Sequence, residues 1–449
     1  MRQQRAFVIC IILPLLLAAL AACSPGHTGG NEIAFIRNGQ LWTIDPDGAN
    51  AFAIVGNNPP VLGYGWSPTH QILTFRTIDA AFAATSAGKH LAINPLTGLA
   101  GDTPSTLNTI GIDGGSPIPI LLSSQGTQYS NAWWNPTGNR LLYREAYSGD
   151  TSPNTMQWWV AQDDQPEGIA RKSLPDSFSI PSLSSNNSMA IGNSTAGVFT
   201  TAIDGTNMRF LIHTELAGHP LPATLERILW QPGHAQPLFL YAIENTATPK
   251  GSENKQQLTV QLIMSSTNGR ETMITTCHCQ QFTWSPDGNA ILYSTGLTDT
   301  VYNIQKATSF SFAAENGSVP YWSPNSHFLL VDGQHTLTLV NIATQQQQLL
   351  LSDNTPATGT NTSAASQLTV NALVQPVSNS IWSADSRHFL FLTRGRLFWQ
   401  SKELSGGNGL YTVAINDNGQ LQGSPTVVDS GNDTQAGWTY EDPNTSFVF

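Results

Sequence analysis

Charged side chains are scarce in this chain: Asp, Glu, Lys and Arg make up 11% of its 449 residues, against about 25% in an average globular protein. The 19 basic and 30 acidic residues give a net charge of −11. A nucleic-acid-binding protein would need a basic patch, and a coiled-coil protein would need many Glu, Lys, Leu and Ala residues. Both classes are therefore excluded, and no nucleic acid is expected among the partners.

Cysteine is also scarce, with four residues in all. Two of them, Cys10 and Cys23, lie near the N-terminus, and the others form the segment Cys277-His278-Cys279. A metal site would need further soft ligands at fixed spacings, and the sequence shows none. We therefore expect neither a bound metal nor a cofactor, and Cys277 and Cys279 form either a disulfide or a pair of thiols.

A single long apolar run occurs, and it occupies the N-terminus. Residues 1–5 contain two arginines, residues 6–22 are uncharged and mostly apolar, and Cys23 follows. A basic start, a short apolar core and small residues before a boundary are typical of a secretory signal peptide.

The segment Leu20-Ala21-Ala22-Cys23 resembles a bacterial lipobox. This resemblance implies that residues 1–22 are removed and that the thiol of Cys23 carries a lipid. Residues 23–30 then form a lipidated N-terminus with a short tether. We expect an exported, membrane-anchored lipoprotein on the extracytoplasmic side, at the cell surface or in the periplasm.

Glycine, proline and tryptophan are well represented, with 38, 27 and 12 residues. One motif recurs, in which Trp, a small polar residue, Pro and a polar turn precede an apolar run. Its copies begin at Trp66, Trp134, Leu183, Trp230, Trp284, Trp322, Trp382 and Trp438. Pro, Asp, Asn and Gly favour tight turns, so each copy predicts a turn between two strands. Each Trp of this box is predicted to fill the core between neighbouring sheets.

A second element follows each box, namely a strand that ends in a hairpin turn. Examples are Ile112-Asp113-Gly114, Ile203-Asp204-Gly205, Asn268-Gly269 and Asn418-Gly419. Dipeptides of this kind are strong hairpin signals. Each unit therefore contains four antiparallel strands A to D, with the box between A and B and the hairpin between C and D, which is the pattern of a β-propeller blade.

The two ends of the chain complement each other, because the first unit has a hairpin without a box and the last has a box without a hairpin. A ring closed by strands from both termini explains this arrangement and leaves no open sheet edges. The count favours eight blades, with seven as the alternative. Both 33–36 and 447–449 fit strand B of the closing blade, so one of them must be displaced.

The complete box Trp284-Ser285-Pro286-Asp287-Gly288 and the strand that follows it resemble the repeat of TolB-like, or WD40-like (PD40), β-propellers. The resemblance covers residues 31–449 and implies an all-β fold in a single propeller domain. TolB itself carries an α/β domain before a smaller ring, which this chain lacks. We expect a monomeric, non-enzymatic binding or scaffolding module for a protein or a glycan.

The longest insertions are expected on one face of the ring. Three lie between strands B and C, at 79–106, 244–256 and 393–408, and a Thr- and Ser-rich loop at 352–367 lies between strand D and the next strand A. In an up-and-down blade these connections share one face, and long loops on one face often form the binding surface. Neutral drift in loop length is the alternative explanation. Candidate contacts beside these loops are Arg76, Arg144, Tyr147, Arg394 and Arg396.

Catalytic motifs are absent from the sequence: it contains no Gly-x-Ser-x-Gly elbow, no His-Glu-x-x-His and no phosphate loop. The alternative function is a carbohydrate-active propeller enzyme similar to a polysaccharide lyase, with a metal in the central channel. Such an enzyme would need several histidines in the channel, whereas the ten histidines are scattered along the chain.

Overall fold

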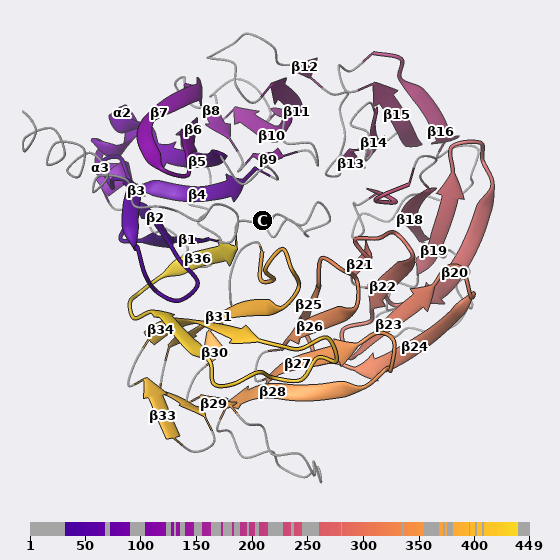
Figure 1. Ribbon diagram of the computed structural model, residues 1–449. Helices are drawn as coiled ribbons and strands as arrows, with labels where there is room; N and C mark the ends of the chain where they lie inside the picture. Colours follow the sequence, from indigo (N-terminus) through magenta and orange to yellow (C-terminus); the bar gives the residue numbers. More distant parts are fainter. Residues whose placement is uncertain are drawn as a thin grey trace, which may run out of the picture.

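The computed structural model describes most of residues 32–438. The described ranges are 32–67, 72–89, 104–122, 127–129, 132–134, 140–147, 155–162, 172–173, 182–183, 189–194, 197–202, 206–213, 228–234, 238–244, 260–279, 281–333, 336–353, 368–370, 373–374, 380–394, 396–399, 402–405 and 408–438. The strands in these ranges assemble into eight sheets that follow one another around a ring, which defines an eight-bladed β-propeller (Figure 1).

Strands from both ends of the chain close the ring. Blade 1 contains, from the inside outward, β36 (Thr434–Trp438), β1 (Ile33–Arg37), β2 (Gln40–Ile44) and β3 (Phe52–Val55). Ile33 of β1 lies opposite both Trp438 and Ile44. The predicted closure is confirmed, and β1 holds the strand B position. The other segment that fits this position, 447–449, lies outside the described residues.

Blades 2 to 5 follow the predicted order of strands A to D. Blade 2 contains β4 (Val61–Trp66), β5 (Ile72–Ile78), β6 (Ser105–Gly111) and β7 (Gly114–Leu121). Blade 3 contains β8 (Thr127–Tyr129), β9 (Trp133–Trp134), β10 (Arg140–Tyr147), β11 (Thr155–Gln162) and β12 (Lys172–Ser173). Blade 4 contains β13 (Ser182–Leu183), β14 (Met189–Ser194), β15 (Gly197–Ala202) and β16 (Arg209–His213). Blade 5 contains β17 (Leu229–Trp230), β18 (Leu238–Glu244), β19 (Val260–Ser266) and β20 (Glu271–Cys277). The degenerate box at Leu183 therefore belongs to a real blade, which decides for eight blades over seven.

Blades 6 to 8 complete the ring. Blade 6 contains β21 (Gln281–Trp284), β22 (Ala290–Ser294), β23 (Thr298–Asn303) and β24 (Thr308–Ala313). Blade 7 contains β25 (Val319–Trp322), β26 (Phe328–Asp332), β27 (Thr336–Asn341) and β28 (Gln347–Asp353). Blade 8 contains β30 (Leu373–Val374), β31 (His388–Arg394), β34 (Asn408–Ala414) and β35 (Thr426–Asp429). The shared pattern of box and hairpin along the sequence thus corresponds to one repeated unit in space.

The box tryptophans lie in the core between blades, as predicted. Seven of them are at most 5% exposed, namely Trp66, Trp134, Trp230, Trp284, Trp322, Trp382 and Trp438. Trp284 of blade 6 packs with Leu240 and Leu262 of blade 5. Its Nε1 atom donates to the carbonyl of Leu229 in blade 5 at 3.1 Å. The indole therefore joins two blades both by apolar packing and by a hydrogen bond.

The turn of the box also joins successive blades. Within the turn, Ser285 Oγ donates to Asp287 Oδ1 at 2.6 Å and accepts from the backbone N–H of Ala290 at 2.9 Å. The backbone N–H of Asp287 donates to Ser326 Oγ, which belongs to the box of blade 7, at 3.0 Å. Gly288 has φ of +68°, and a Cβ atom there would lie 2.5 Å from the carbonyl oxygen of Pro232 in blade 5. Glycine is required here because the two box turns approach so closely.

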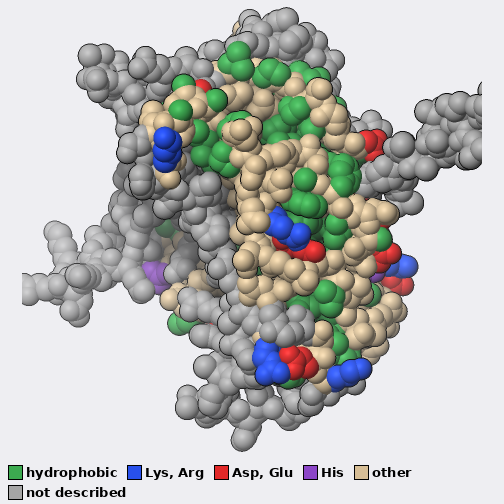
Figure 2. All heavy atoms as spheres, turned by 90° about the vertical axis from the view of Figure 1, so that its left-hand side faces the viewer, with side chains coloured by type: hydrophobic (Ala, Val, Ile, Leu, Met, Phe, Trp, Pro, Cys, Tyr) green, Lys and Arg blue, Asp and Glu red, His purple; other side chains and the backbone are tan. Residues whose placement is uncertain are grey.

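These contacts place the box turns side by side on one face of the ring, together with the hairpin turns between strands C and D. We call this the box face. The opposite face, formed by the connections from B to C and from D to the next A, is the loop face. Charged side chains are sparse on the side of the ring that lies on the left in Figure 1, and several positive groups lie next to negative ones (Figure 2).

Candidate functional site

A helical insertion covers the loop face of blade 2. It contains α2 (Ala80–Ala83) and α3 (Ser86–Lys89), which follow β5 and precede β6, where the sequence predicted an insertion. Asp79 caps α2, because its Oδ1 atom accepts from the backbone N–H of Phe82 at 2.7 Å. Phe82 and Ala83 pack against Leu62 and Ile78 of the blade. This insertion is therefore anchored to the ring through an apolar contact.

A second insertion enlarges blade 7. Strand β29 (Leu368–Val370) lies between blades 7 and 8 in the sequence and pairs in parallel with β28. It also pairs with β32 (Leu397–Trp399), which forms a hairpin with β33 (Lys402–Ser405). The resulting seven-stranded sheet extends the outer edge of blade 7 with strands that the chain supplies on either side of strand β31 (Figure 1).

This added sheet was not predicted. The segment 352–367 was expected to be a loop, whereas β28 continues to Asp353; residues 354–367 lie outside the described part of the chain. The insertion at 393–408 does lie between strands B and C, but it contains the hairpin of β32 and β33. Strands of three or four residues carry too little alternation to be recognised in a sequence.

Arg396 lies at the start of this hairpin and is exposed, with its charge paired. Its Nε atom donates to Glu403 Oε1 at 2.9 Å, and its Nη2 atom contacts Glu403 Oε2. The guanidinium also lies over the ring of Phe398, 5.6 Å from the centroid. The hydrogen bond from Arg396 lowers the pKa of the Glu403 carboxyl. The hairpin thus holds the planar guanidinium of Arg396 in a fixed orientation over the ring of Phe398. Such a group is suited to stacking or hydrogen bonding with a ligand.

Arg76 lies in the interior, at 4% exposure. Its Nη1 atom donates to the carbonyl of Tyr129 in blade 3 at 2.8 Å. Burial lowers the pKa of the guanidinium to about 10. The contact that the structure shows for Arg76 is therefore a link between blades 2 and 3.

For the other predicted contact residues, Arg144, Tyr147 and Arg394, the structure describes only the position of the backbone. Arg144 and Tyr147 lie in β10, opposite Trp158 and Thr155 of β11. Arg394 ends β31 opposite Asn408. The five candidate residues are thus spread over blades 2, 3, 7 and 8, with Arg396 at the start of the hairpin added to blade 7. The side chains of Arg144, Tyr147 and Arg394 lie outside the described part of the structure, as does the whole of Cys23.

Two buried carboxyl groups lie at the loop ends of blades 6 and 7. Asp332 ends β26 and is 3% exposed; burial and the nearby Glu315 raise its pKa to about 8. Burial also raises the pKa of Asp299, which is fully buried, and the Ser294 hydroxyl opposes this shift. Single Asp residues in strands give no sequence signal, so these groups were missed. At neutral pH, a carboxyl group with this pKa is mostly protonated, which suits its buried position.

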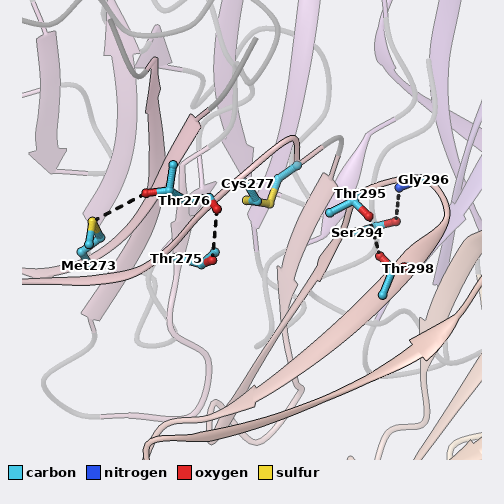
Figure 3. The surroundings of a disulfide bond; sticks show 9 residues. Met273, Thr275, Thr276, Cys277, Ser294, Thr295, Gly296 and Thr298 are labelled. Carbon is cyan, nitrogen blue, oxygen red and sulfur yellow. Dashed lines mark hydrogen bonds between the residues drawn. A yellow bond between two sulfur atoms is a disulfide. The ribbon is translucent and has the colours of Figure 1, made fainter. Parts of the chain in front are cut away.

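The structure joins Cys277 and Cys279 in a disulfide, with 5.1 Å between their Cα atoms. Cys277 ends β20 and Cys279 precedes β21, so the bond lies in the connection between blades 5 and 6. The turn from Ser294 to Thr298 of blade 6 appears in the same surroundings (Figure 3). Cys279 is buried and His278 is exposed. The pair therefore belongs to the loop face.

The described histidines give no metal site. Among the residues in the described ranges, no group of three or more His, Cys, Asp or Glu side chains is arranged to hold a metal ion. His234, His327 and His388 lie in or beside three different box turns, and the ring of His388 contacts Trp438 of blade 1. Within the same described ranges, the helices are too short to cross a membrane.

No protein-family model matches the chain, and no curated protein matches it. Among solved structures, a eukaryotic initiation factor is similar at 12% identity and a TM-score of 0.48, covering 92% of this chain and 99% of that chain. An oligogalacturonate lyase in complex with manganese is similar at 11% identity and a TM-score of 0.43, covering 69% of this chain and 81% of that chain. A functionally unknown protein from Desulfotomaculum acetoxidans DSM 771 is similar at 10% identity and a TM-score of 0.42, covering 91% and 98%. Likenesses of this degree carry no functional argument, and the class of this protein, an all-β propeller, is defined by its eight sheets.

Proposed function

We propose that this chain is a TolB-like, WD40-like (PD40) lipoprotein, anchored through Cys23 on the extracytoplasmic side of a membrane. Its propeller acts as a monomeric, non-enzymatic module that binds a protein or a glycan on the loop face. One observation carries this proposal: the helices α2 and α3 and the strands β29, β32 and β33 are all additions to connections of the loop face. Loops held by a rigid scaffold are where binding residues concentrate.

The contrast between the two faces supports this assignment. On the box face, turns such as Ser285–Gly288 and Ser323–Ser326 are short and bonded to each other across blades. On the loop face, Leu297 is 67% exposed, and Arg396 carries its guanidinium on an exposed hairpin. Exposed apolar and arginine side chains also occur on the box face, at Met208 and Arg387, so the bonds between box turns of successive blades are what distinguish the two faces.

The binding role is tested with photo-crosslinking amino acids placed one at a time on each face. We use Leu297 on the loop face and Lys306 on the box face, and expose the full-length protein to envelope proteins and to a glycan array. Specific capture through position 297 and not through position 306 is expected. Turnover of a polysaccharide such as polygalacturonate by the purified protein would instead establish the enzymatic alternative and contradict this proposal.

The anchor is tested separately with the substitution Cys23→Ala. We expect the variant to lose lipid labelling and to be released from membranes, because the thiol is the only attachment point of the lipid. Unchanged membrane association of the variant would show that the lipobox prediction is wrong.

A further inference from the structure

The first described residue, Glu32, lies at the box face of the ring. Glu32 precedes β1 and is 1% exposed. Burial and two carboxylates, those of Asp45 and Asp113, raise its pKa to about 7. Asp45 begins the hairpin turn of blade 1 and Asp113 lies within that of blade 2, and both turns belong to the box face. Glu32 is therefore held at the box end of its strand, close to two neighbouring hairpins.

The opposite end of the same strand reaches the loop face. Arg37 ends β1, and its Nε atom donates to Asp433 in the connection from blade 8 to blade 1 at 2.8 Å. The five residues of β1 span about 17 Å at about 3.3 Å per residue.

A lipid on Cys23 would leave a short connection to this entry point. Eight residues, 24–31, separate Cys23 from Glu32. A chain of this length spans at most about 30 Å when fully extended. Turning the loop face toward the bilayer would require the connection to run back along the length of β1, about 17 Å, which uses more than half of that reach.

We infer that the protein sits with its box face toward the lipid surface and its loop face pointing away from the membrane. This inference rests on the proposed lipid anchor and deepens the proposed function, because it makes the loop face available to partners that approach from outside the membrane. Such a partner is a macromolecule free in the extracytoplasmic space or held on an opposing surface, and the lipids of the anchoring membrane do not reach that face.

The side chains of the box face agree with contact at the level of the lipid headgroups. Many exposed residues at its hairpin turns are polar, among them Asp47, Asn268, Lys306 and Asn418, whereas Met208 in the hairpin of blade 4 is an apolar side chain that is 50% exposed. Insertion into the acyl chains would need exposed Trp, Phe or Leu residues. The box face therefore lies against the headgroup layer without penetrating it, and the lipid supplies the attachment.

One blade provides a matched pair of positions for the test. Leu297 precedes β23 on the loop face, and Lys306 follows it on the box face. The six residues between Thr298 and Asn303 separate the two positions by about 20 Å. Leu297→Cys and Lys306→Cys are each labelled with a donor dye on the lipidated protein, in phosphatidylcholine vesicles that contain an acceptor-labelled lipid.

Stronger energy transfer from position 306 than from position 297 is the expected result. Equal transfer, or stronger transfer from position 297, would overturn the orientation. The same variants carrying Cys23→Ala separate this failure from that of the anchor: if they still bind the vesicles, the proposed lipid attachment itself is wrong. Unfolding curves of both labelled variants check that the ring is intact.

Discussion

The Nε atom of Arg37 donates a hydrogen bond to Oδ1 of Asp433 at 2.8 Å, although the two residues are 396 positions apart in the chain. The same guanidinium contacts Asp429, and it lies 5.1 Å from the ring centroid of Phe35 and 5.3 Å from that of Trp42. Strand β1 from the N-terminal side and the connection before β36 from the C-terminal side are thereby joined. This cluster holds the closing blade together on the loop face.

Removal of Arg37 is therefore expected to weaken the closure of the ring. The Asp433 side chain is fully buried, and a buried carboxylate without its partner costs about 3–5 kcal/mol. Because Arg37 itself is 23% exposed, we expect Arg37→Ala to lower the free energy of unfolding by about 2–3 kcal/mol in urea. Arg387→Ala is the control, since its pair with Asp417 is exposed and contributes about 0–1 kcal/mol. Similar losses in both variants would contradict this role.

Substitution of a box tryptophan should destabilise the contact between two blades. Trp284→Phe removes the donor to the Leu229 carbonyl and leaves a cavity where a fully buried indole stood. We expect a loss of about 2–4 kcal/mol, from the unpaired carbonyl and the lost packing together. Trp399→Phe serves as the control, because Trp399 is only partly buried at the edge of its cluster. A smaller loss at position 284 than at position 399 would argue against the core role of the box.

The raised pKa of Asp332 predicts that the free energy of unfolding depends on pH. Its pKa is raised from an ordinary value of 3.8 to about 8, by burial first and then by Glu315, and Tyr321 and Thr336 also face this cluster. Between pH 4 and 8 the folded state holds a proton that the unfolded state has lost, so stability falls as pH rises through this window.

Asp332→Asn should abolish this contribution because its side chain does not titrate. We expect the stability of the variant relative to the natural protein to increase by at least about 1.4 kcal/mol, the equivalent of one pKa unit, between pH 4 and pH 9. Melting curves at both pH values measure the change, and Asp417→Asn, at an exposed position, is the control. A difference independent of pH would show that Asp332 is ionised in the folded protein.

The disulfide is checked by alkylation and mass spectrometry on the Cys23→Ala protein in urea. Without a reductant we expect no alkyl group on Cys277 or Cys279, and after reduction we expect one on each. Because only His278 lies between them, the bond closes a very small loop and its loss should cost only about 1–2 kcal/mol. Alkylation of both residues without reduction would identify them as free thiols.

The repeat could be predicted from the sequence because the signals that define it are local. Turn residues such as Pro286 and Gly288 act within a few positions, and the Trp that precedes them recurs with the same neighbours. The complementary ends of the chain then implied closure of the ring, and β1 and β36 realise it. Even the degenerate box at Leu183 kept enough of this pattern to be assigned to a blade.

The added sheet and the position of Arg76 depend on tertiary structure. Strand β29 pairs with β28 in parallel and with β32 through a hydrogen-bond ladder, and none of these pairings follows from the short segments themselves. Arg76 was expected beside a loop at the surface, yet the end of its strand faces Tyr129 of the next blade. Which way a side chain points at the end of a strand is decided by how neighbouring blades pack.

The sequence by itself determined the repeated unit, the strand order within each blade and the use of both termini to close the ring, because turn chemistry and strand alternation act over a few residues. Only the tertiary structure decided which distant groups meet: Arg37 with Asp433, Asp332 with Glu315, and the entry of the chain on the box face. These contacts depend on long-range packing between blades, in which charge and burial act through space and not along the chain.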